Sequence, residues 1–240
     1  MKAYIQSNED GLPHHFDAAC ALYGAIDSGY DYKLISYDRL DAIDPQLFKE
    51  NLFVGSVEFM TKIFDKLGKS PRVPDNSNRD EETVSLSEAK ARVLSGERLF
   101  IKPRQIKLFT GSVMTRDFIS CLNPYPDDTE VIVCKPFESE IASEWRCYVR
   151  KALISGPIAD IRCYSGDPFA TPNKDYILEV FNENISRYPK AYTIDVGMLS
   201  DGSNVVIEYN DMWSIGNYGM DNSIYFSLLK ERYFEIARGI

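Results

Sequence analysis

The chain has 240 residues, of which 44% are hydrophobic and 26% are charged, as is ordinary for a soluble globular protein of one or two domains. Its net charge of -9 argues against binding along a nucleic-acid backbone, which requires clustered lysines and arginines. No apolar run is long enough to span a membrane and the first residues lack the apolar core of a signal peptide, so we expect a cytoplasmic protein without a membrane partner.

The first 75 residues alternate between strand-like and helix-like segments. Strands are predicted at 2–6, 32–37 and 52–54, and helices at 16–26 and 57–67. This alternation predicts a small α/β domain with a partly parallel sheet. The segment 70–82 is rich in proline, asparagine and charged residues, and it is predicted to be a linker.

From residue 85 the pattern changes. Ser87 is predicted to cap a helix that ends at Ser95-Gly96, and a buried strand is predicted at 99–103. A turn, a helix and a strongly apolar strand are predicted next, at 110–111, 116–121 and 131–137. Lys102 lies at the end of the first strand, where a lysine either extends to water or pairs with an anion.

A long hairpin with period-two alternation is predicted at 144–164, with its turn at Ser155-Gly156-Pro157. One face is predicted to carry Trp145, Cys147, Val149, Ala159, Ile161 and Cys163. The other face is predicted to carry Glu144, Arg146, Tyr148, Asp160, Arg162 and Tyr164. The two arginines are either surface charges balanced by the acids or fixed cations of a site. A helix is predicted to follow at 172–187.

A second hairpin, at 192–210, places two carboxylates opposite each other. Its Asp201-Gly202 pair favours a two-residue type I′ turn, because both central residues need positive φ. The resulting register pairs Met198 with Val205, Val196 with Ile207, Ile194 with Tyr209, Asp195 with Glu208 and Thr193 with Asn210. The first three pairs form an apolar face, and the last two form a polar face.

The facing carboxylates indicate a metal site. Like charges repel unless a cation lies beside them, and Mg²⁺ prefers oxygen ligands, usually one or two carboxylates together with substrate phosphates. Asp195, Glu208 and Asn210 are therefore predicted to hold Mg²⁺ next to a phosphate. The alternative is that these acids are solvated on an exposed strand face.

Several motifs in this order resemble the ATP-grasp superfamily, and within it the clade named for two arginines and a lysine. The resemblance extends from residue 85 to the C-terminus. Lys102 in Phe-Ile-Lys-Pro matches the lysine that contacts the ATP phosphates. Lys107 begins a segment, 107–111, at the position of the phosphate loop, although it is short and poor in glycine. The strand ending Val-Cys-Lys-Pro-Phe matches the hinge, whose backbone at Lys135 and Phe137 would bind adenine.

The two hairpins match the remaining motifs of that clade. Glu144 corresponds to the acid that binds the ribose hydroxyls, and Arg146 corresponds to the first arginine. Arg162 corresponds to the second arginine, expected near the γ-phosphate or acyl phosphate. The metal-binding aspartate and the Glu-x-Asn pair correspond to Asp195, Glu208 and Asn210.

The resemblance implies an α+β chain with an ATP-grasp fold. It implies an ATP-grasp domain at 76–240, with lobes at about 76–137 and 138–240 and Mg-ATP between them. The small α/β domain at 1–75 would precede it and help to hold the acceptor substrate. The loop 213–219, before a closing helix predicted at 221–237, would line the acceptor pocket through Trp213, Asn217 and Tyr218. Its alternative role is a tight crossover with aromatic side chains packed inward.

The leading functional hypothesis is an ATP-dependent carboxylate-amine (or thiol) ligase that forms an acyl phosphate and releases ADP and phosphate. ATP and Mg²⁺ are the expected cofactors. Lys102 and Arg162 would neutralise developing charge, while Arg146 would orient phosphate or the substrate carboxylate. Such chemistry needs no protein nucleophile, and the sequence offers no plausible Ser-His or Cys-His pair.

Two alternatives remain open. A kinase of this fold would transfer phosphate to a hydroxyl group and release no free phosphate. A noncatalytic nucleotide-binding module would act through partners, and the short phosphate loop is compatible with it. An amino acid, a small peptide or a protein terminus would all be suitable acceptors.

Overall fold

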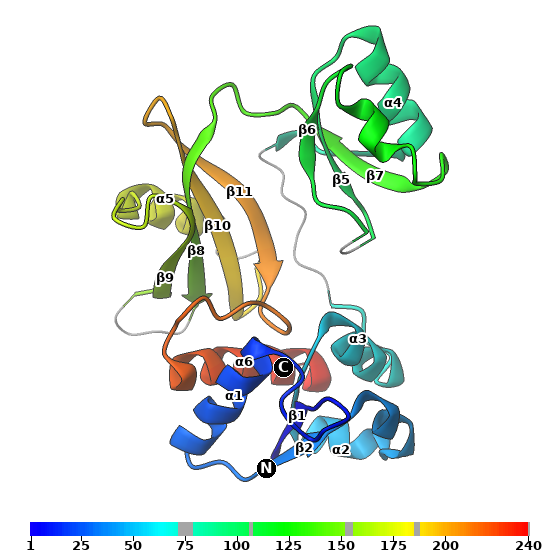
Figure 1. The fold of residues 1–240 in the computed structure, drawn as a ribbon. Helices are drawn as coiled ribbons and strands as arrows, with labels where there is room; N and C mark the ends of the chain where they lie inside the picture. The colour runs from blue at the N-terminus through cyan, green and yellow to red at the C-terminus, as the bar shows by residue number, and fades with distance from the viewer. Residues whose placement is uncertain (72–78, 106–107, 152–155, 185–187, 240) are drawn as a thin grey trace. The chain divides into compact units, whose positions relative to one another are not determined.

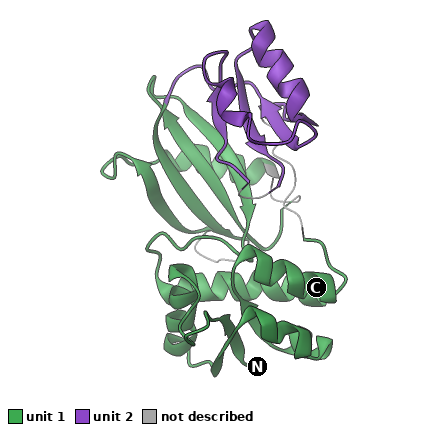
Figure 2. Ribbon diagram, turned by 45° about the vertical axis from the view of Figure 1, so that its right-hand side comes forward, with its two compact units in different colours: residues 1–74, 141–240 green, residues 75–140 purple. Residues whose placement is uncertain are grey.

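The computed structural model describes residues 1–71, 79–105, 108–151, 156–184 and 188–239 (Figure 1). Its mixture of helices and largely antiparallel sheets confirms the predicted α+β class. The chain forms two compact units (Figure 2). Unit 1 comprises Met1–Pro74 and Ile141–Ile240, and unit 2 comprises Asp75–Glu140. Unit 1 contains two hydrophobic clusters and unit 2 contains one among the described residues.

The N-terminal part of unit 1 is the predicted small α/β arrangement. A parallel sheet has the strand order β2-β1-β3. Its elements are β1 (Ala3–Gln6), α1 (Phe16–Asp27), β2 (Tyr32–Ile35), β3 (Leu52–Val54) and α3 (Val57–Lys66). Two helices are capped by polar side chains: the His15 imidazole accepts from the Ala18 N–H and Ser56 accepts from the Phe59 N–H.

Two short elements between β2 and β3 were not predicted. The 3₁₀ helix η1 (Tyr37–Ala42) ends the strand that was expected to reach residue 37, and α2 (Pro45–Glu50) follows. Asp44 caps α2 and Pro45 occupies its first turn, a start signal that sequence reading should have used. Because each element has only six residues, about two helical turns at most, neither repeats an amphipathic period.

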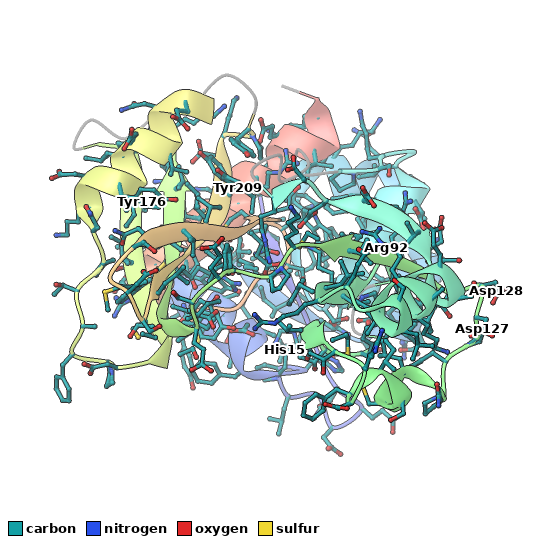
Figure 3. All side chains as sticks on the ribbon, turned by 90° about the horizontal axis from the view of Figure 1, so that it is seen from above. His15, Arg92, Asp127, Asp128, Tyr176 and Tyr209 are labelled. Carbon is teal, nitrogen blue, oxygen red and sulfur yellow. The ribbon has the colours of Figure 1, made fainter. Side chains whose placement is uncertain are left out.

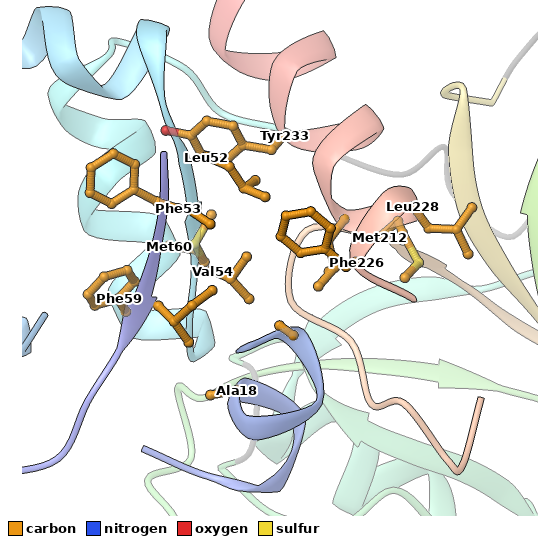
Figure 4. Packing of buried hydrophobic residues seen from close by; sticks show 14 of the residues in the cluster. Ala18, Leu52, Phe53, Val54, Phe59, Met60, Met212, Phe226, Leu228 and Tyr233 are labelled. Carbon is orange, nitrogen blue, oxygen red and sulfur yellow. The ribbon is translucent and has the colours of Figure 1, made fainter. Parts of the chain in front are cut away.

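The C-terminal helix α6 (Asn222–Arg238) packs against the N-terminal elements and joins both ends of the chain in one core. Figure 4 shows Phe226 and Tyr233 of α6 beside Leu52 and Phe53 of β3. Helices α1 and α6 approach so closely that a Cβ atom at Gly24 would lie 2.0 Å from the Asn222 carbonyl oxygen. This contact therefore requires glycine at that position.

The second sheet of unit 1 is antiparallel with the order β11-β10-β8-β9. Its strands are β8 (Ile141–Arg150), β9 (Ile158–Gly166), β10 (Ala191–Leu199) and β11 (Asn204–Asp211). Helix α5 (Lys174–Asn184) covers one face through a hydrophobic cluster, against which Tyr176 and Tyr209 pack (Figure 3). The last residues of the helix predicted at 172–187, and Ser155 of the predicted turn, lie outside the described residues.

The β8-β9 hairpin largely follows the predicted division between its faces. Trp145, Cys147 and Val149 belong to the cluster under α5, and Ile161 and Cys163 pack against it. Ala159 is the exception, because it packs against the N-terminal core instead. The register shifts between Tyr148 and Val149, where the strand pairs change from Asp160 to Ile158. This bulge turns Ala159 to the opposite face.

Unit 2 packs one helix on one face of a four-stranded antiparallel sheet of order β4-β7-β5-β6. Its elements are β4 (Glu82–Ser85), α4 (Leu86–Ser95), β5 (Leu99–Pro103), β6 (Ser112–Met114), η3 (Ile119–Leu122) and β7 (Glu130–Cys134). Ser85, rather than the predicted Ser87, caps α4, and Gly96 ends it in the left-handed conformation with φ of 114°.

Three boundaries in unit 2 differ from prediction. The helix expected near 116–121 is the short 3₁₀ element η3, and β7 ends at Cys134 rather than at residue 137. Strand β4 begins at Glu82, inside the segment predicted as a linker; residues 72–78 of that segment lie outside the described residues. Among the described helices, none is long and apolar enough to cross a membrane.

Candidate functional site

The acidic hairpin β10-β11 has the predicted pair of facing carboxylates, but its turn and part of its register differ from the prediction. The Gly202 N–H donates to the Leu199 carbonyl, the Leu199 N–H donates to the Ser203 carbonyl, and Gly202 has φ of 86°. This is a three-residue loop ending in a left-handed glycine, not a two-residue turn. The predicted pairs of Met198 with Val205 and of Val196 with Ile207 are therefore wrong.

A bulge restores the predicted register further along the hairpin. Val196 pairs with Val206 while Asp195 pairs with Glu208, so Ile207 is the extra residue. The pairs of Ile194 with Tyr209 and of Thr193 with Asn210 are confirmed with it. Turn and bulge each shift the register by one residue in opposite directions, and the carboxylates consequently face each other as predicted.

Asp195, Glu208 and Asn210 form a connected cluster on the sheet face opposite α5, which we call the acidic cluster. The Asn210 amide nitrogen lies 3.3 Å from Asp195 Oδ2 and 3.0 Å from Glu208 Oε1, so one side chain joins both carboxylates. Asp195 is 1% exposed. The exposed-face alternative therefore does not describe Asp195, whereas Glu208 is partly buried and keeps some access to solvent.

Arg146 of β8 is the counter-ion of Asp195. Strand β10 lies between β8 and β11, and Arg146 is directly opposite Asp195. The guanidinium donates from Nε to Oδ1 at 2.8 Å and from Nη2 to Oδ2 at 2.6 Å, a bidentate pair. Burial raises the pKa of Asp195 to about 6, although the Arg146 charge acts in the opposite direction.

Two tyrosine rings cover the Arg146 guanidinium. Tyr164 and Tyr218 stack with their centroids 5.2 Å apart, and Arg146 Cζ lies 5.6 Å and 5.0 Å from the two rings. Burial raises the pKa of Tyr164, to which the charge of Asp195 and a hydrogen bond with Glu144 add. Tyr218 has φ of 49°, an uncommon backbone conformation for a non-glycine residue.

The second arginine, Arg162 on β9, lies opposite Arg146 but has another partner. Its Nε and Nη2 atoms lie 2.8 Å and 2.6 Å from Asp160 Oδ2. The Arg162 side chain is 37% exposed, in contrast to 8% for Arg146. Arg162 is therefore balanced by its neighbour on the same strand and keeps access to solvent.

Helix α6 fixes the end of β11 immediately after Asn210. Arg232 Nε and Nη2 each lie 2.6 Å from an oxygen of Asp211, and Arg232 Nη1 lies 2.9 Å from Glu235. The Glu235 carboxylate also accepts from the Lys190 N–H just before β10. The two strands that carry the acidic cluster are thus tied to one helix.

The loop 213–219 packs largely inward. Trp213 makes an edge contact with Phe64 at 5.4 Å, and Asn217 is 1% exposed. The Asn217 side chain bonds within the loop, to the Met220 carbonyl and the Gly219 N–H. Tyr218 is 47% exposed and is the one of the three predicted acceptor residues that reaches both the solvent and the site. The predicted acceptor role of all three remains a prediction.

The predicted phosphate and adenine residues lie in unit 2. Lys102 Nζ is 3.1 Å from Glu81 Oε1, Lys135 is exposed after β7, and Phe137 lies beside the Arg79 guanidinium. Lys107 lies outside the described residues. A Cβ atom at Gly111 would lie 2.9 Å from Lys102 Cβ, so the backbone passes close to the lysine there.

Sequence reading missed Arg79 and Glu81, because both lie in the segment predicted as a linker. Arg79 contacts the rings of Phe100 and Phe137, at 4.9 Å and 4.3 Å from their centroids. The only available signal was the short charged run at 79–82 directly before a helix cap. That signal does not by itself indicate contact with Lys102.

Comparison with known families decides the assignment. A family model described as the ATP-grasp domain of R2K clade family 2 matches residues 79–228. The chain belongs to this ATP-grasp family. The predicted resemblance is thereby confirmed, and membership supports the prediction of an ADP-forming ATP-grasp ligase. No curated protein matches the chain.

Solved structures share the ATP-grasp fold at low sequence identity. N5-carboxyaminoimidazole synthetase from Staphylococcus aureus, complexed with ADP, matches 97% of this chain and 76% of its own, with 12% identity and a TM-score of 0.56. A RimK domain ATP-grasp protein from Sphaerobacter thermophilus matches 95% and 99%, with 12% identity and a TM-score of 0.58. D-alanine–D-alanine ligase from Bacillus anthracis, complexed with ATP, matches 99% and 98%, with 12% identity and a TM-score of 0.53.

The acidic cluster of this ATP-grasp chain fits Mg²⁺ in its chemistry. Two carboxylates are hard oxygen donors, which Mg²⁺ prefers to combine with water and substrate phosphate, and Asn210 would add its amide oxygen if the amide group turned, since its nitrogen faces both acids here. Beside them, the buried Thr193 hydroxyl has no hydrogen-bond partner among the described residues. No group of three or more histidine, cysteine, aspartate or glutamate side chains forms a metal cage in the described part of the chain. The ion would therefore depend on the substrate for further ligands.

Proposed function

We propose that the chain is an ATP-dependent carboxylate-amine (or thiol) ligase that works through an acyl phosphate and releases ADP and phosphate. The observation that carries the proposal is the acidic cluster, in which the buried Asp195 faces Glu208 across a bulged hairpin and pairs with Arg146. A buried carboxylate is costly unless it is paired or ligated, and a second carboxylate directly opposite Asp195 adds like-charge repulsion, which favours a functional role for the pair.

Nucleotides in related structures support the choice of ATP. The Staphylococcus aureus synthetase is complexed with ADP and the Bacillus anthracis ligase with ATP. We propose that Glu144 binds the ribose hydroxyls of the same nucleotide in this chain, and that the backbone at Lys135 and Phe137 binds adenine. Lys102, and Lys107 after it, would contact the phosphates.

The proposed reaction begins with in-line attack of a substrate carboxylate on the γ-phosphate. Asp195, Glu208 and Asn210 would hold Mg²⁺, which neutralises phosphate charge when it is bound. Arg162 can leave its partly exposed pair with Asp160 to meet the transferred phosphoryl group. An amine or thiol then attacks the acyl carbon and displaces phosphate.

We propose that Arg146 positions Asp195 and keeps this partner throughout the reaction. Its guanidinium is bidentate to Asp195 and covered by two rings, so it holds this carboxylate in one orientation. The edge of the guanidinium that is not used by Asp195 would orient phosphate or the substrate carboxylate. This assignment combines both roles in one fixed cation.

The acceptor is proposed to be an amino acid, a small peptide or a protein terminus, met in the cytoplasm. We propose that the domain at 1–75 helps to hold it and that the ATP-grasp domain at 76–240, with lobes at about 76–137 and 138–240, binds Mg-ATP. Trp213, Asn217 and Tyr218 stay proposed acceptor residues, and the exposed ring of Tyr218 over Arg146 is the strongest support among them.

The test is Mg²⁺-dependent release of ADP and phosphate from ATP with pooled amino acids and short peptides. Glu208→Gln is the test variant, and Glu179→Gln, an exposed acid on α5, is the matched control. Ligase chemistry predicts stimulated release of both products, lost in the first variant and kept in the second. ADP formed with phosphorylated acceptor and no free phosphate would instead indicate a kinase. Tight Mg-ATP binding without turnover in any pool would favour a noncatalytic binding module.

A further inference from the structure

One face of the unit 2 sheet carries a second set of charged and aromatic contacts, separate from the acidic cluster. Along β5, Leu99 and Ile101 point into the core under α4, so the alternating residues Phe100 and Lys102 lie on the opposite face. This face, with one cation and an aromatic ring, has the chemistry that a base and a phosphate require.

A planar cation already occupies the aromatic part of that face. The Arg79 guanidinium lies 4.9 Å from the Phe100 ring and 4.3 Å from the Phe137 ring. A guanidinium is flat and delocalised, and it stacks on rings as a nucleobase does. Its Nε is buried and has no hydrogen-bond partner in the described part of the chain. Nε therefore makes no hydrogen bond among these residues, and the guanidinium lies against the two rings.

The carboxylate of Glu81, from the same short segment, pairs with the Lys102 ammonium group. Glu81 Oε1 lies 3.1 Å from Lys102 Nζ, and the two side chains are only 16% and 23% exposed. Asp80, between Arg79 and Glu81, has φ of 46°. Aspartate tolerates this left-handed conformation better than most residues, and here it connects the residue that contacts the rings with the residue that pairs with the lysine.

We propose that Arg79–Glu81 is a built-in imitation of the nucleotide, with the guanidinium in place of the base and the Glu81 carboxylate in place of a phosphate. The inference rests on the proposed function, because it takes this face as the nucleotide-binding surface of unit 2. ATP must displace the segment to reach Phe137 and Lys102. The segment protects the rings and the lysine in the absence of nucleotide and lowers the apparent affinity.

The size of the effect follows from the fraction of molecules in which the segment is displaced. When the segment covers the site in some molecules, the apparent affinity equals the intrinsic affinity multiplied by the fraction of molecules in which the site is free. If the segment is in place in about 70–90% of molecules, removing it tightens binding by about 3-fold to 10-fold. Glu81→Gln keeps the shape of the side chain and removes its charge, and Arg79→Ala removes the stacked group.

The experiment is equilibrium binding of ADP with Mg²⁺ to the full chain by calorimetry, with thermal melting to verify the fold of each variant. Matched controls are Glu82→Gln and Arg92→Ala, because Glu82 and Arg92 pair with each other away from Lys102. Arg92 lies on α4, the helix side of the sheet (Figure 3). The controls are expected to bind as the natural chain does.

Tighter ADP binding by Glu81→Gln and by Arg79→Ala, with unchanged controls, is the expected result. The Glu81→Gln gain should disappear in a Lys102→Met background, because the carboxylate acts through that lysine. Unchanged or weaker binding in either single variant overturns the inference while leaving the proposed function intact. Failure of the natural chain and of every variant to bind ADP overturns both.

Discussion

The two units each pair a basic side chain with an acid, but the two pairs differ in burial and in how they are held. In unit 1, Arg146 and Asp195 are 8% and 1% exposed, joined by two hydrogen bonds, and placed by paired strands. In unit 2, Lys102 and Glu81 are 23% and 16% exposed, joined by one hydrogen bond, and placed by a loop residue with positive φ. The first pair is the more buried and the more strongly bonded of the two, and the second is the one that we propose exchanges partners.

This difference suits two tasks that the proposed phosphoryl-transfer site would have. Orienting a metal-binding carboxylate requires a partner that does not move, since small displacements reduce the rate strongly. Binding and releasing a nucleotide requires a cation that can change partners. Measurements on the two pairs should therefore differ in kind as well as in size.

The largest effect is expected from Arg146→Met. It leaves Asp195 buried without its counter-ion, and breaking a buried ion pair costs about 3–5 kcal/mol of unfolding free energy. Arg162→Met is the control, because its pair with Asp160 is partly exposed and should be worth at most about 1 kcal/mol. Urea unfolding of both variants measures the contrast. Equal losses would remove the distinction between a fixed and an exchangeable arginine.

Glu208→Gln should separate function from stability. Removing a ligand charge from the acidic cluster is expected to reduce Mg²⁺-dependent turnover by about 100-fold or more, since the metal supplies several kcal/mol to the transition state. Unfolding free energy should change by less than about 1 kcal/mol, because Gln keeps the side-chain shape. Retained turnover in this variant would refute the metal assignment.

Lys102→Met should change ATP affinity more than stability, whereas Arg146→Met should mainly reduce stability. Loss of a partly exposed pair is expected to change stability by less than about 1 kcal/mol. The dissociation constant of ATP should rise about 10-fold or more, because a hydrogen bond to a charged group contributes about 1.5–3 kcal/mol. Titration calorimetry with ATP, alongside urea unfolding, tests both halves. A large stability loss without an affinity change would contradict the exchange role.

The smallest effect is expected at the rings over Arg146. Tyr218→Ala removes one cation–ring contact and should cost about 0.5–1 kcal/mol. Glycine adopts a positive φ without strain, whereas alanine does not. Tyr218→Gly should therefore recover part of that cost and be the more stable of the two variants. Tyr218→Phe keeps the ring and serves as the control. Thermal melting that ranks alanine above glycine would count against strain at this position.

The acidic cluster shows what could and what could not be predicted from the sequence. The prediction that Asp195 faces Glu208 is confirmed, yet two assumptions behind it were wrong and cancelled. Asp-Gly signals a left-handed glycine but does not set the loop length, and a bulge at Ile207 leaves no sequence mark. Residues beyond the bulge were therefore predicted correctly, and those between the bulge and the turn were not.

The patterns of the two hairpins could not predict which residue is the counter-ion of Asp195. Period-two alternation assigns Arg146 to a polar face but does not say which strand lies beside it. Only the order β11-β10-β8-β9 brings it opposite Asp195. Arg79 and Glu81 were missed for a related reason, because composition marks a loop but not the surface on which it folds. The long helices, whose caps and apolar periods are local, were predicted within a few residues.

The most direct test of the central claim follows oxygen atoms from the acceptor to the phosphate. Amino acids and short peptides with oxygen-18 in their carboxyl groups are incubated with ATP, Mg²⁺ and the chain, and the released phosphate is analysed by mass spectrometry. Attack of a carboxylate on the γ-phosphate predicts that one labelled oxygen appears in each phosphate released with ADP. Phosphate without label, formed while the acceptor is consumed, would contradict an acyl-phosphate ligase.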